Sequence, residues 1–317
     1  MRVAAIDCGT NSLRLLVADV DATGTLADVT REMVVVRLGE GVDQTGVLAP
    51  SALERTFAAV EDYAATCDRL GVEAVRFVAT SATRDAANRE LLVEGVRVRL
   101  GVPADVITGD EEARLSFRGA TGSLAPGLDA PYLVVDLGGG STELVLGETS
   151  PEHAHSMDVG CIRMTERHLA AEPPAQTDID AAVCDVRAAL DDAARDVPLG
   201  RTRTLVGLAG SVTTITARAL ALDAYRPERI DGAVLPIDDL VVAANELLAM
   251  PRAERATLPY MHPGRVDSIG AGGLVWREVM LRVREEVAAE GGRLDVAVSS
   301  EHDILDGVAL ALAAARA

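Results

Sequence analysis

Apolar positions in the first part of the chain predict three strands followed by alternating helices and strands. A hairpin is expected over residues 3–17 and a third strand over residues 33–38. A helix follows at 51–70, because its apolar side chains recur at spacings of four and three and so share one buried face. Further elements are expected at residues 75–79 (strand), 85–100 (helix), 105–108 (strand) and 111–119 (helix).

The second part of the chain repeats this order with insertions. Strands are expected at residues 132–136, 142–147, 154–159, 204–208 and 294–298, and helices at 161–170, 177–196, 211–222, 238–250, 271–289 and from 303. The stretch from Thr121 to Pro131 is rich in glycine and proline, which is typical of a boundary between domains. We therefore expect one lobe over residues 1–125 and another over residues 126–317, with the terminal helix able to return to the first lobe.

One hairpin sequence occurs in both parts of the chain. In the later copy an apolar strand ends at Asp136, three consecutive glycines follow, and a second apolar strand begins. Aligning Asp7 with Asp136 also matches Gly9 with Gly138, Ser12 with Ser141 and Leu15 with Leu144. Such a repeat indicates a duplicated domain. Because glycines leave backbone N–H groups uncovered, two such loops facing across a cleft would hold a phosphate chain. Either loop alone would also fit an ordinary β-hairpin turn.

The composition narrows the class of protein. A hydrophobic content of 49% supports well-filled cores, and 317 residues are enough for two domains. The net charge of −19 argues against nucleic acid or an anionic membrane as a partner. All 30 basic residues are arginine, which excludes the lysine chemistry of Walker A ATPases, protein kinases and Schiff-base enzymes. Four separated cysteines, no signal-peptide pattern and no apolar run of about 20 residues lead us to expect a cytoplasmic location.

A third glycine cluster, at residues 207–214, lies between an expected strand and an expected helix. Its amide groups and the helix dipole favour an anion or the edge of a nucleotide, so Gly210 and Ser211 are candidate binding residues. A plain strand-to-helix turn with Ser211 as N-cap fits the same pattern equally well.

Two sets of acidic residues are candidates for chemistry. Glu111 and Glu112 begin an expected helix, where acids oppose the helix dipole favourably; alternatively, one of them takes a proton from water. The pattern does not choose between these neighbours. Asp136 and Glu143 flank the glycine loop on opposite strands, which suits Mg²⁺, with Asp7 as a third candidate ligand. A strand-end aspartate can instead bond the amides of its loop.

Arginine side chains beside glycine-, serine- and threonine-rich junctions suit phosphate oxygens. The arginines in such surroundings are Arg14, Arg84, Arg114, Arg118, Arg163 and Arg265. The residues expected to bind phosphate are Gly9, Thr10, Asn11, Ser12, Arg14, Arg84, Gly138, Gly139, Gly140, Ser141, Thr142, Arg163, Gly210 and Ser211. His153 and His155 share one face of an expected strand, but without a third ligand nearby they are interpreted as surface residues.

Five segments of the chain, taken together and in this order, resemble the exopolyphosphatase / guanosine pentaphosphate phosphohydrolase family. The resemblance rests on residues 5–16, 79–88, 107–117, 135–143 and 160–163, which read AIDCGTNSLRLL, ATSATRDAAN, ITGDEEARLSF, VDLGGGSTE and GCIR. It implies the duplicated actin-like ATPase (ribonuclease-H-like) fold, an α/β fold with two βββαβαβα lobes around a cleft. It also implies that Glu112 is the general base and that Asp136 and Glu143 serve Mg²⁺.

The expected function is Mg²⁺-dependent release of terminal orthophosphate from inorganic polyphosphate, by attack of a water that Glu112 deprotonates. The same machinery acting on guanosine pentaphosphate, with a role in the stringent response, is an alternative. A kinase of the actin-like superfamily would need an acceptor pocket and an aspartate base, which the sequence does not reveal. A non-catalytic regulator that binds polyphosphate or nucleotide is the alternative outside enzymes. A homodimer is among the expected assemblies.

The chain departs from longer members of this family in two places. Those members carry a C-terminal helical region of the HD type, and this chain ends where that region would begin. The segment from Asp303 to Gly307 also lacks the arginine that many of them have before the glycine. Because the chain is strongly acidic and has no lysine, we expect a preference for short polyphosphates and stepwise release on longer ones.

Overall fold

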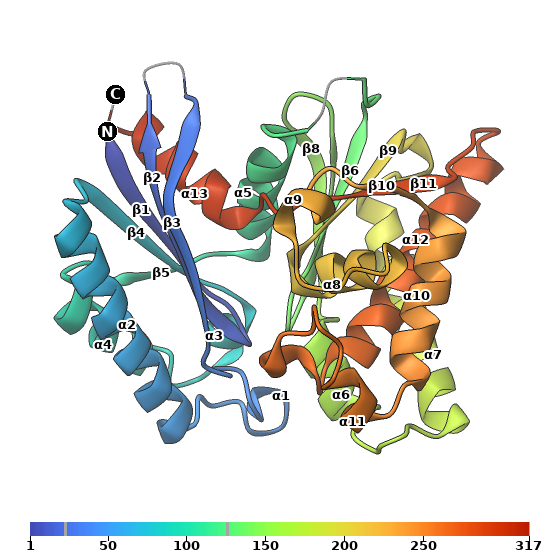
Figure 1. Ribbon diagram of the computed structural model, residues 1–317, viewed down its shortest axis with the longest axis horizontal. Helices are drawn as coiled ribbons and strands as arrows, with labels where there is room; N and C mark the ends of the chain where they lie inside the picture. The colour runs from blue at the N-terminus through green and yellow to red at the C-terminus, as the bar shows by residue number, and fades with distance from the viewer. Residues whose placement is uncertain (22–23, 125–126, 317) are drawn as a thin grey trace. The chain divides into compact units, whose positions relative to one another are not determined.

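The structure is a computed structural model in which residues 1–21, 24–124 and 127–316 are described. These residues form two compact α/β units (Figure 1). The first unit contains residues 1–119 and the chain from Ile304 onward, and the second contains residues 120–303. The boundary expected between residues 125 and 126 lies outside the described residues. Within the described ranges, no helix is both long enough and apolar enough to cross a membrane.

The first unit is built on a five-stranded sheet with the order β3-β2-β1-β4-β5. Its elements are β1 (Arg2–Cys8), β2 (Ser12–Val20), β3 (Leu26–Val35), α1 (Val42–Thr45), α2 (Pro50–Leu70), β4 (Ala74–Ala79), α3 (Ser81–Asp85), α4 (Glu90–Leu100), β5 (Ala104–Val106), α5 (Gly109–Thr121) and α13 (Ile304–Ala314). Strands β1, β2 and β3 pair antiparallel, whereas β1, β4 and β5 pair parallel.

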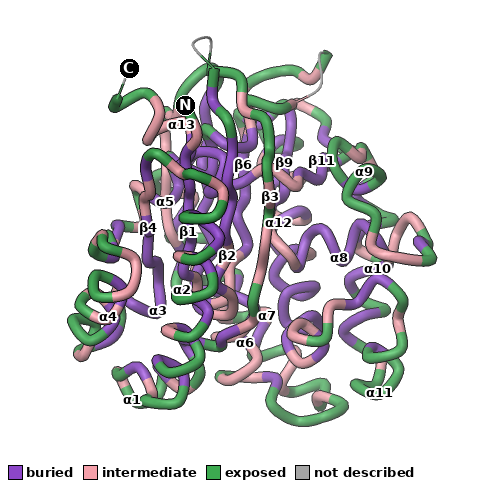
Figure 2. Tube along the Cα trace, turned by 60° about the vertical axis from the view of Figure 1, so that its left-hand side comes forward, coloured by how far each residue is buried: buried purple, intermediate pink, exposed green. Residues whose placement is uncertain are grey.

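Side chains of this first sheet alternate between two apolar cores. On β1, Ala4 and Ile6 belong to the core that contains residues of α2 and α4, whereas Val3 and Ala5 belong to the core that contains α13. This period of two is typical of a strand that is buried on both faces. Figure 2 shows the central strands β1 and β2 buried along most of their length, while the edge strand β3 is mostly exposed or half-buried.

The second unit is built on a six-stranded sheet with the order β10-β11-β9-β6-β7-β8. Its strands are β6 (Tyr132–Leu137), β7 (Thr142–Gly147), β8 (Pro151–Met157), β9 (Thr204–Leu208), β10 (Val234–Pro236) and β11 (Val296–Ser299). Its helices are α6 (Cys161–Arg167), α7 (Gln176–Asp196), α8 (Ala209–Ala219), α9 (Pro227–Ile230), α10 (Ile237–Ala249), α11 (Arg252–Arg255) and α12 (Ile269–Ala289), with 3₁₀ turns η1 (Leu199–Arg201) and η2 (Pro263–Arg265).

The core of the second unit lies on one face of this sheet. Leu133, Val135 and Leu137 of β6 belong to it, together with the fully buried Trp276 of α12. Gly207 of β9 permits this packing, because an added Cβ would lie 2.8 Å from the Trp276 ring. Since side chains alternate along a strand, Asp136 lies on the opposite face of the sheet.

The third strand differs from the one expected at residues 33–38. It runs from Leu26 to Val35 and pairs only with β2, so its first residues are exposed and carry little apolar signal. The amides of Val36 and Arg37 instead donate to the carbonyl of Asn11. The apolar run at residues 33–38 therefore covers only the end of β3 and the turn after it. Most of the strand lies before this run.

The helix expected at 85–100 begins only at Glu90, as α4, and a separate short helix, α3, ends at Asp85. Asn88 lies between them, where its side chain accepts from the amide of Leu48 (2.8 Å) and donates to the carbonyl of Leu48 (3.0 Å). These two bonds tie the chain between the helices to the loop before α2. The short strand β10 was not expected, because three residues between turns show no periodicity.

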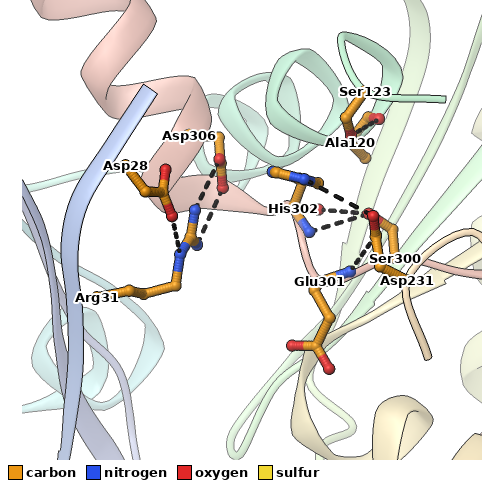
Figure 3. Close-up of polar contacts among 9 residues, drawn as sticks. All are labelled: Asp28, Arg31, Ala120, Ser123, Asp231, Ser300, Glu301, His302 and Asp306. Carbon is orange, nitrogen blue, oxygen red and sulfur yellow. Dashed lines mark hydrogen bonds and ion pairs between the residues drawn. The ribbon is translucent and has the colours of Figure 1, made fainter. Parts of the chain in front are cut away.

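An ion pair and a close backbone contact fix α13 in the first unit. Arg31 of β3 donates to both oxygens of Asp306 (2.8 and 3.2 Å) and to Asp28 (3.0 Å), as Figure 3 shows. At Gly307 an added Cβ would lie 2.0 Å from the carbonyl oxygen of Leu115 in α5. A residue without a side chain is therefore needed at position 307 for α13 to approach α5.

Candidate active site

The two glycine loops share one backbone turn. The amide of Gly9 donates to the carbonyl of Ser12, and the amide of Gly138 donates to the carbonyl of Ser141, both at 3.0 Å. In each hairpin the aspartate that precedes the turn is opposite the residue seven positions later, Arg14 in the first and Glu143 in the second. The sequence repeat thus corresponds to a repeated local structure.

The start of α6 holds the second loop. The amides of Cys161 and Ile162 donate to the carbonyls of Gly138 (3.0 Å) and Gly139 (2.8 Å), and Arg163 Nε donates to the carbonyl of Gly140 (2.7 Å). In a trans peptide the C=O and N–H groups point in opposite directions. The amides that follow these carbonyls in the loop therefore point away from α6, where they can meet an anion.

The chain after β3 and the start of α3 brace the first loop. The amide of Gly39 donates to the carbonyl of Thr10 (2.8 Å), and the hydroxyls of Thr10 and Ser81 are hydrogen-bonded at 2.9 Å. Asn11 accepts, through its carbonyl, the two amides that follow β3. The loop is thus held by backbone bonds on one side and by a buried hydroxyl pair on the other.

The structure separates the two neighbouring glutamates at the start of α5. Glu112 has a side chain that is only 10% exposed, and Arg84 Nη1 donates to its Oε2 at 2.5 Å. The Glu111 side chain is 44% exposed and pairs with Arg76 at 2.6 Å. Because successive helical residues are rotated by about 100°, neighbours in sequence face different surroundings. Arg84, expected to bind phosphate, also holds Glu112.

Cross-strand neighbours form two comparable rows of side chains, one in each sheet. The first row is Val78, Asp7, Arg14 and Met33, and the second row is Leu208, Asp136, Glu143 and Ser156. In the first row, Arg14 Nε and Nη2 both donate to Asp7 Oδ2, at 3.0 and 2.6 Å. Asp7, which the sequence offered as a third metal ligand, is therefore ion-paired with an arginine.

The second row places two carboxylates side by side. Asp136 is 7% exposed and Glu143 is 1% exposed, and Ser156 Oγ donates to Glu143 Oε1 at 2.7 Å. Across the parts of the chain that the structure describes, no group of three or more His, Cys, Asp or Glu side chains is arranged to hold a metal ion. Mg²⁺ is commonly held by one or two carboxylates with water and substrate phosphates. The pair Asp136 and Glu143 fits that description.

The third glycine cluster contains a strained residue and an arginine. Ala209 has φ = 68°, in the left-handed region that L-residues other than glycine seldom adopt. An added Cβ at Gly210 would lie 2.2 Å from Arg265 Cζ, so the guanidinium rests directly on this glycine. Ser211 is buried within α8 and is not its N-cap, which is Leu208. The turn therefore differs from the simple serine-capped alternative.

A half-buried polar pair, Tyr225 and Glu301, lies in the same unit, with Glu301 just after β11. Tyr225 donates its hydroxyl to Glu301 Oε1 (2.6 Å), and burial raises the pKa of both groups, that of Tyr225 to about 12. The amide of Glu301 donates to Asp231 (3.0 Å), and Ser300 and His302 are joined by hydrogen bonds, as Figure 3 shows. Tyr225, Glu301 and Ser156 were not among the expected site residues, because no local pattern distinguishes them from surface residues.

Two units that each begin with three antiparallel strands, and that repeat an aspartate–glycine hairpin, define an actin-like ATPase fold. A profile of the Ppx/GppA phosphatase family matches residues 16–300 of this chain. Exopolyphosphatase 2 of Mycobacterium tuberculosis is 49% identical, over 98% of this chain and 98% of that protein.

Solved structures agree with this match. The crystal structure of an exopolyphosphatase-like protein superimposes with a TM-score of 0.95 at 46% identity and covers 98% of both chains. The Ppx/GppA family member of Aquifex aeolicus superimposes with a TM-score of 0.80 at 27% identity, over 100% of this chain and 98% of that one. The chain belongs to the Ppx/GppA phosphatase family, and the predicted family and actin-like fold are confirmed. The roles of individual site residues stay predictions.

The packing of α6 on the second loop gives a steric prediction. At Gly160 an added Cβ would lie 2.5 Å from the backbone of Gly139, which cannot move as a side chain can. Gly160→Ala should therefore lower the free energy of unfolding by about 1–3 kcal/mol. Gly9→Ala is the matched control, since its Cβ would be 3.6 Å from the nearest atom, the Ser12 carbonyl oxygen. Equal melting temperatures for the two variants would contradict this packing.

Proposed function

We propose that this protein is an exopolyphosphatase that releases terminal orthophosphate from inorganic polyphosphate with the help of Mg²⁺. The similarity to Exopolyphosphatase 2 over nearly the whole of both chains supports this substrate class. The observation that carries the proposal is the buried pair Asp136 and Glu143 on the hairpin that holds the triple-glycine loop. A non-catalytic regulator would have no need of two buried negative charges beside an anion-binding loop.

In this proposal Glu112 takes a proton from the attacking water. Its side chain is largely buried and held by Arg84, so its carboxylate has a defined orientation, as a general base requires. Glu111 is exposed and pairs with Arg76, which suits a surface role. The different surroundings of the two neighbours support Glu112 over Glu111 as the base.

Asp136 and Glu143 would hold the divalent cation. Asp136 and Glu143 are buried cross-strand neighbours, and a hard cation with oxygen ligands would offset repulsion between two such carboxylates. A divalent cation held there would supply positive charge that stabilises charge developing on phosphate oxygens. Asp7 is left out of this role, because Arg14 already neutralises it at 2.6 Å.

Backbone amides and arginines would bind the phosphate chain. The amides of the second loop point away from α6, and Arg163 is held against that loop by its bond to the Gly140 carbonyl. Arg14 and Arg84 would contribute donors while each also holds a carboxylate, since a guanidinium group carries five N–H donors. Gly210 would lie beside the Arg265 guanidinium, and Ser211 is one residue further along the same turn.

Guanosine pentaphosphate is the alternative substrate, and it would place the protein in the stringent response. The family name covers both kinds of phosphohydrolase, so the assay must compare the two substrates under one Mg²⁺ concentration. We place the reaction in the cytoplasm, in keeping with cysteines that are all unpaired. A homodimer stays a prediction.

The glutamate assignment is tested by a pair of conservative substitutions. Glu112→Gln keeps the size of the side chain but removes the proton acceptor, so orthophosphate release from polyphosphate should fall by about 10²–10⁴-fold. Glu111→Gln is the matched control and should keep nearly full activity, because its side chain is exposed. If the control loses activity and Glu112→Gln does not, the base is the other neighbour.

Replacing the strand-end aspartate by asparagine should have different effects in the two rows of side chains. Asp7→Asn removes half of an ion pair with Arg14 and should lower the melting temperature. Asp136→Asn removes one of the two carboxylates proposed to hold the cation, so the Mg²⁺ concentration for half-maximal activity should rise, and this effect should exceed any effect on the melting temperature. Glu143→Gln should behave like Asp136→Asn. A destabilised Asp136→Asn with normal Mg²⁺ dependence would favour loop bonding as the role of this carboxylate.

Chain length is tested on gels. The protein carries a net charge of −19 and no lysine, so phosphate residues beyond the loops and their arginines meet an acidic surface. Digestion of long polyphosphate should therefore give a ladder of intermediate lengths, and added salt should improve long substrates relative to short ones. Long chains that disappear directly to orthophosphate, without intermediates, would overturn this preference.

A further inference from the structure

The second row ends in a hydroxyl group that touches a proposed metal ligand. Ser156 of β8 is the cross-strand neighbour of Glu143, and its Oγ donates to Glu143 Oε1 at 2.7 Å. Glu143 is 1% exposed and lies opposite Asp136 on β6. Three neighbouring strands thus contribute one polar side chain each at the same level of the sheet.

The first row has different residues at the equivalent positions. There the residue in the place of Ser156 is Met33, which has neither a charge nor a hydroxyl. The residue in the place of Glu143 is Arg14, which pairs directly with Asp7. The second row, with two carboxylates, therefore also has a hydroxyl donor. The first row, in which Arg14 pairs with Asp7, has Met33 in that place.

A carboxylate with one oxygen engaged has less rotational freedom. The bond from Ser156 to Oε1 restricts rotation of the carboxylate and so narrows the positions that Oε2 can take. Hydrogen-bonding partners of metal ligands act in this way, orienting the ligand and reducing the entropy lost when the ion binds. The donor also offsets part of the cost of burying the Glu143 charge beside Asp136.

We propose that Ser156 is a positioning residue that orients Glu143 for a divalent cation. This inference rests on the proposed function, in which Asp136 and Glu143 hold the ion. Ser156 itself is not a ligand in this assignment; it acts through the carboxylate of Glu143. Its effect must therefore appear in the affinity for the cation, even when no substrate is present.

The test measures cation affinity directly. Mn²⁺ is the probe, followed by the loss of its free-ion electron paramagnetic resonance signal, with Mg²⁺ added as competitor. Ser156→Ala should weaken Mn²⁺ binding by about 10-fold, the lower end of the effect known for partners of metal ligands. Ser156→Thr keeps the hydroxyl on a strand that accepts β-branched residues, and it should bind Mn²⁺ within about 2-fold of the unaltered protein.

Three control variants separate the possible failures. Ser150→Ala makes the same change in the exposed turn before β8 and should leave Mn²⁺ affinity unaltered. Asp136→Asn and Glu143→Gln should each abolish measurable binding. If they do so while Ser156→Ala binds like the unaltered protein, the role of Ser156 is overturned and the proposed function stands. If they also bind normally, or if the unaltered protein does not bind Mn²⁺, the metal site itself is wrong and the inference fails with it.

Discussion

The residue opposite the strand-end aspartate sets the electrostatics of each unit. Both hairpins have the same turn, so Asp7 meets Arg14 and Asp136 meets Glu143 at equivalent places. The first pair neutralises itself at 2.6 Å, whereas the second concentrates two negative charges in a buried row. Like charges held in this way are costly unless a cation or a proton joins them. One duplicated element is thus a closed ion pair in one unit and a prospective cation site in the other.

The positions of the second loop and of α13 depend on close backbone packing at two glycines, where a side chain would not fit. The start of α6 approaches the second loop at Gly160, and α13 approaches α5 at Gly307. The first contact turns the loop carbonyls toward α6 and so directs the loop amides the other way. The second holds α13 against the helix that carries Glu112. Glycine at these positions has a steric role, because neither residue has a positive φ.

The sequence predicted the parts of this arrangement that have a period or a repeat. Alternating apolar residues indicated the strands, and the duplicated hairpin indicated the duplicated fold. It failed where structure follows from tertiary contacts: β3 is an exposed edge strand without apolar signal, and Asn88 interrupts an otherwise helical stretch by bonding to Leu48. For the same reason the sequence did not single out Ser156, because its contact with Glu143 on β7 is a cross-strand contact that no local pattern reveals. The residues alone left Glu111 and Glu112 open and the resemblance implied Glu112; the ion pairs with Arg76 and Arg84 show that the two side chains have different surroundings.

The arginine pairing bears on how so acidic a protein would bind the polyanion that we propose as its substrate. Arg14 and Arg84 each share their charge with a carboxylate, Asp7 and Glu112, so neither contributes a full positive charge to its surroundings. In the proposed function, attraction for phosphate would then come largely from backbone amides at the loops and from a cation at Asp136 and Glu143. Both sources act over a few ångströms, within which the screened surface charge matters little. If the proposed function holds, the net charge of −19 would limit how far a bound chain extends over the surface, without preventing the binding of its terminal phosphate.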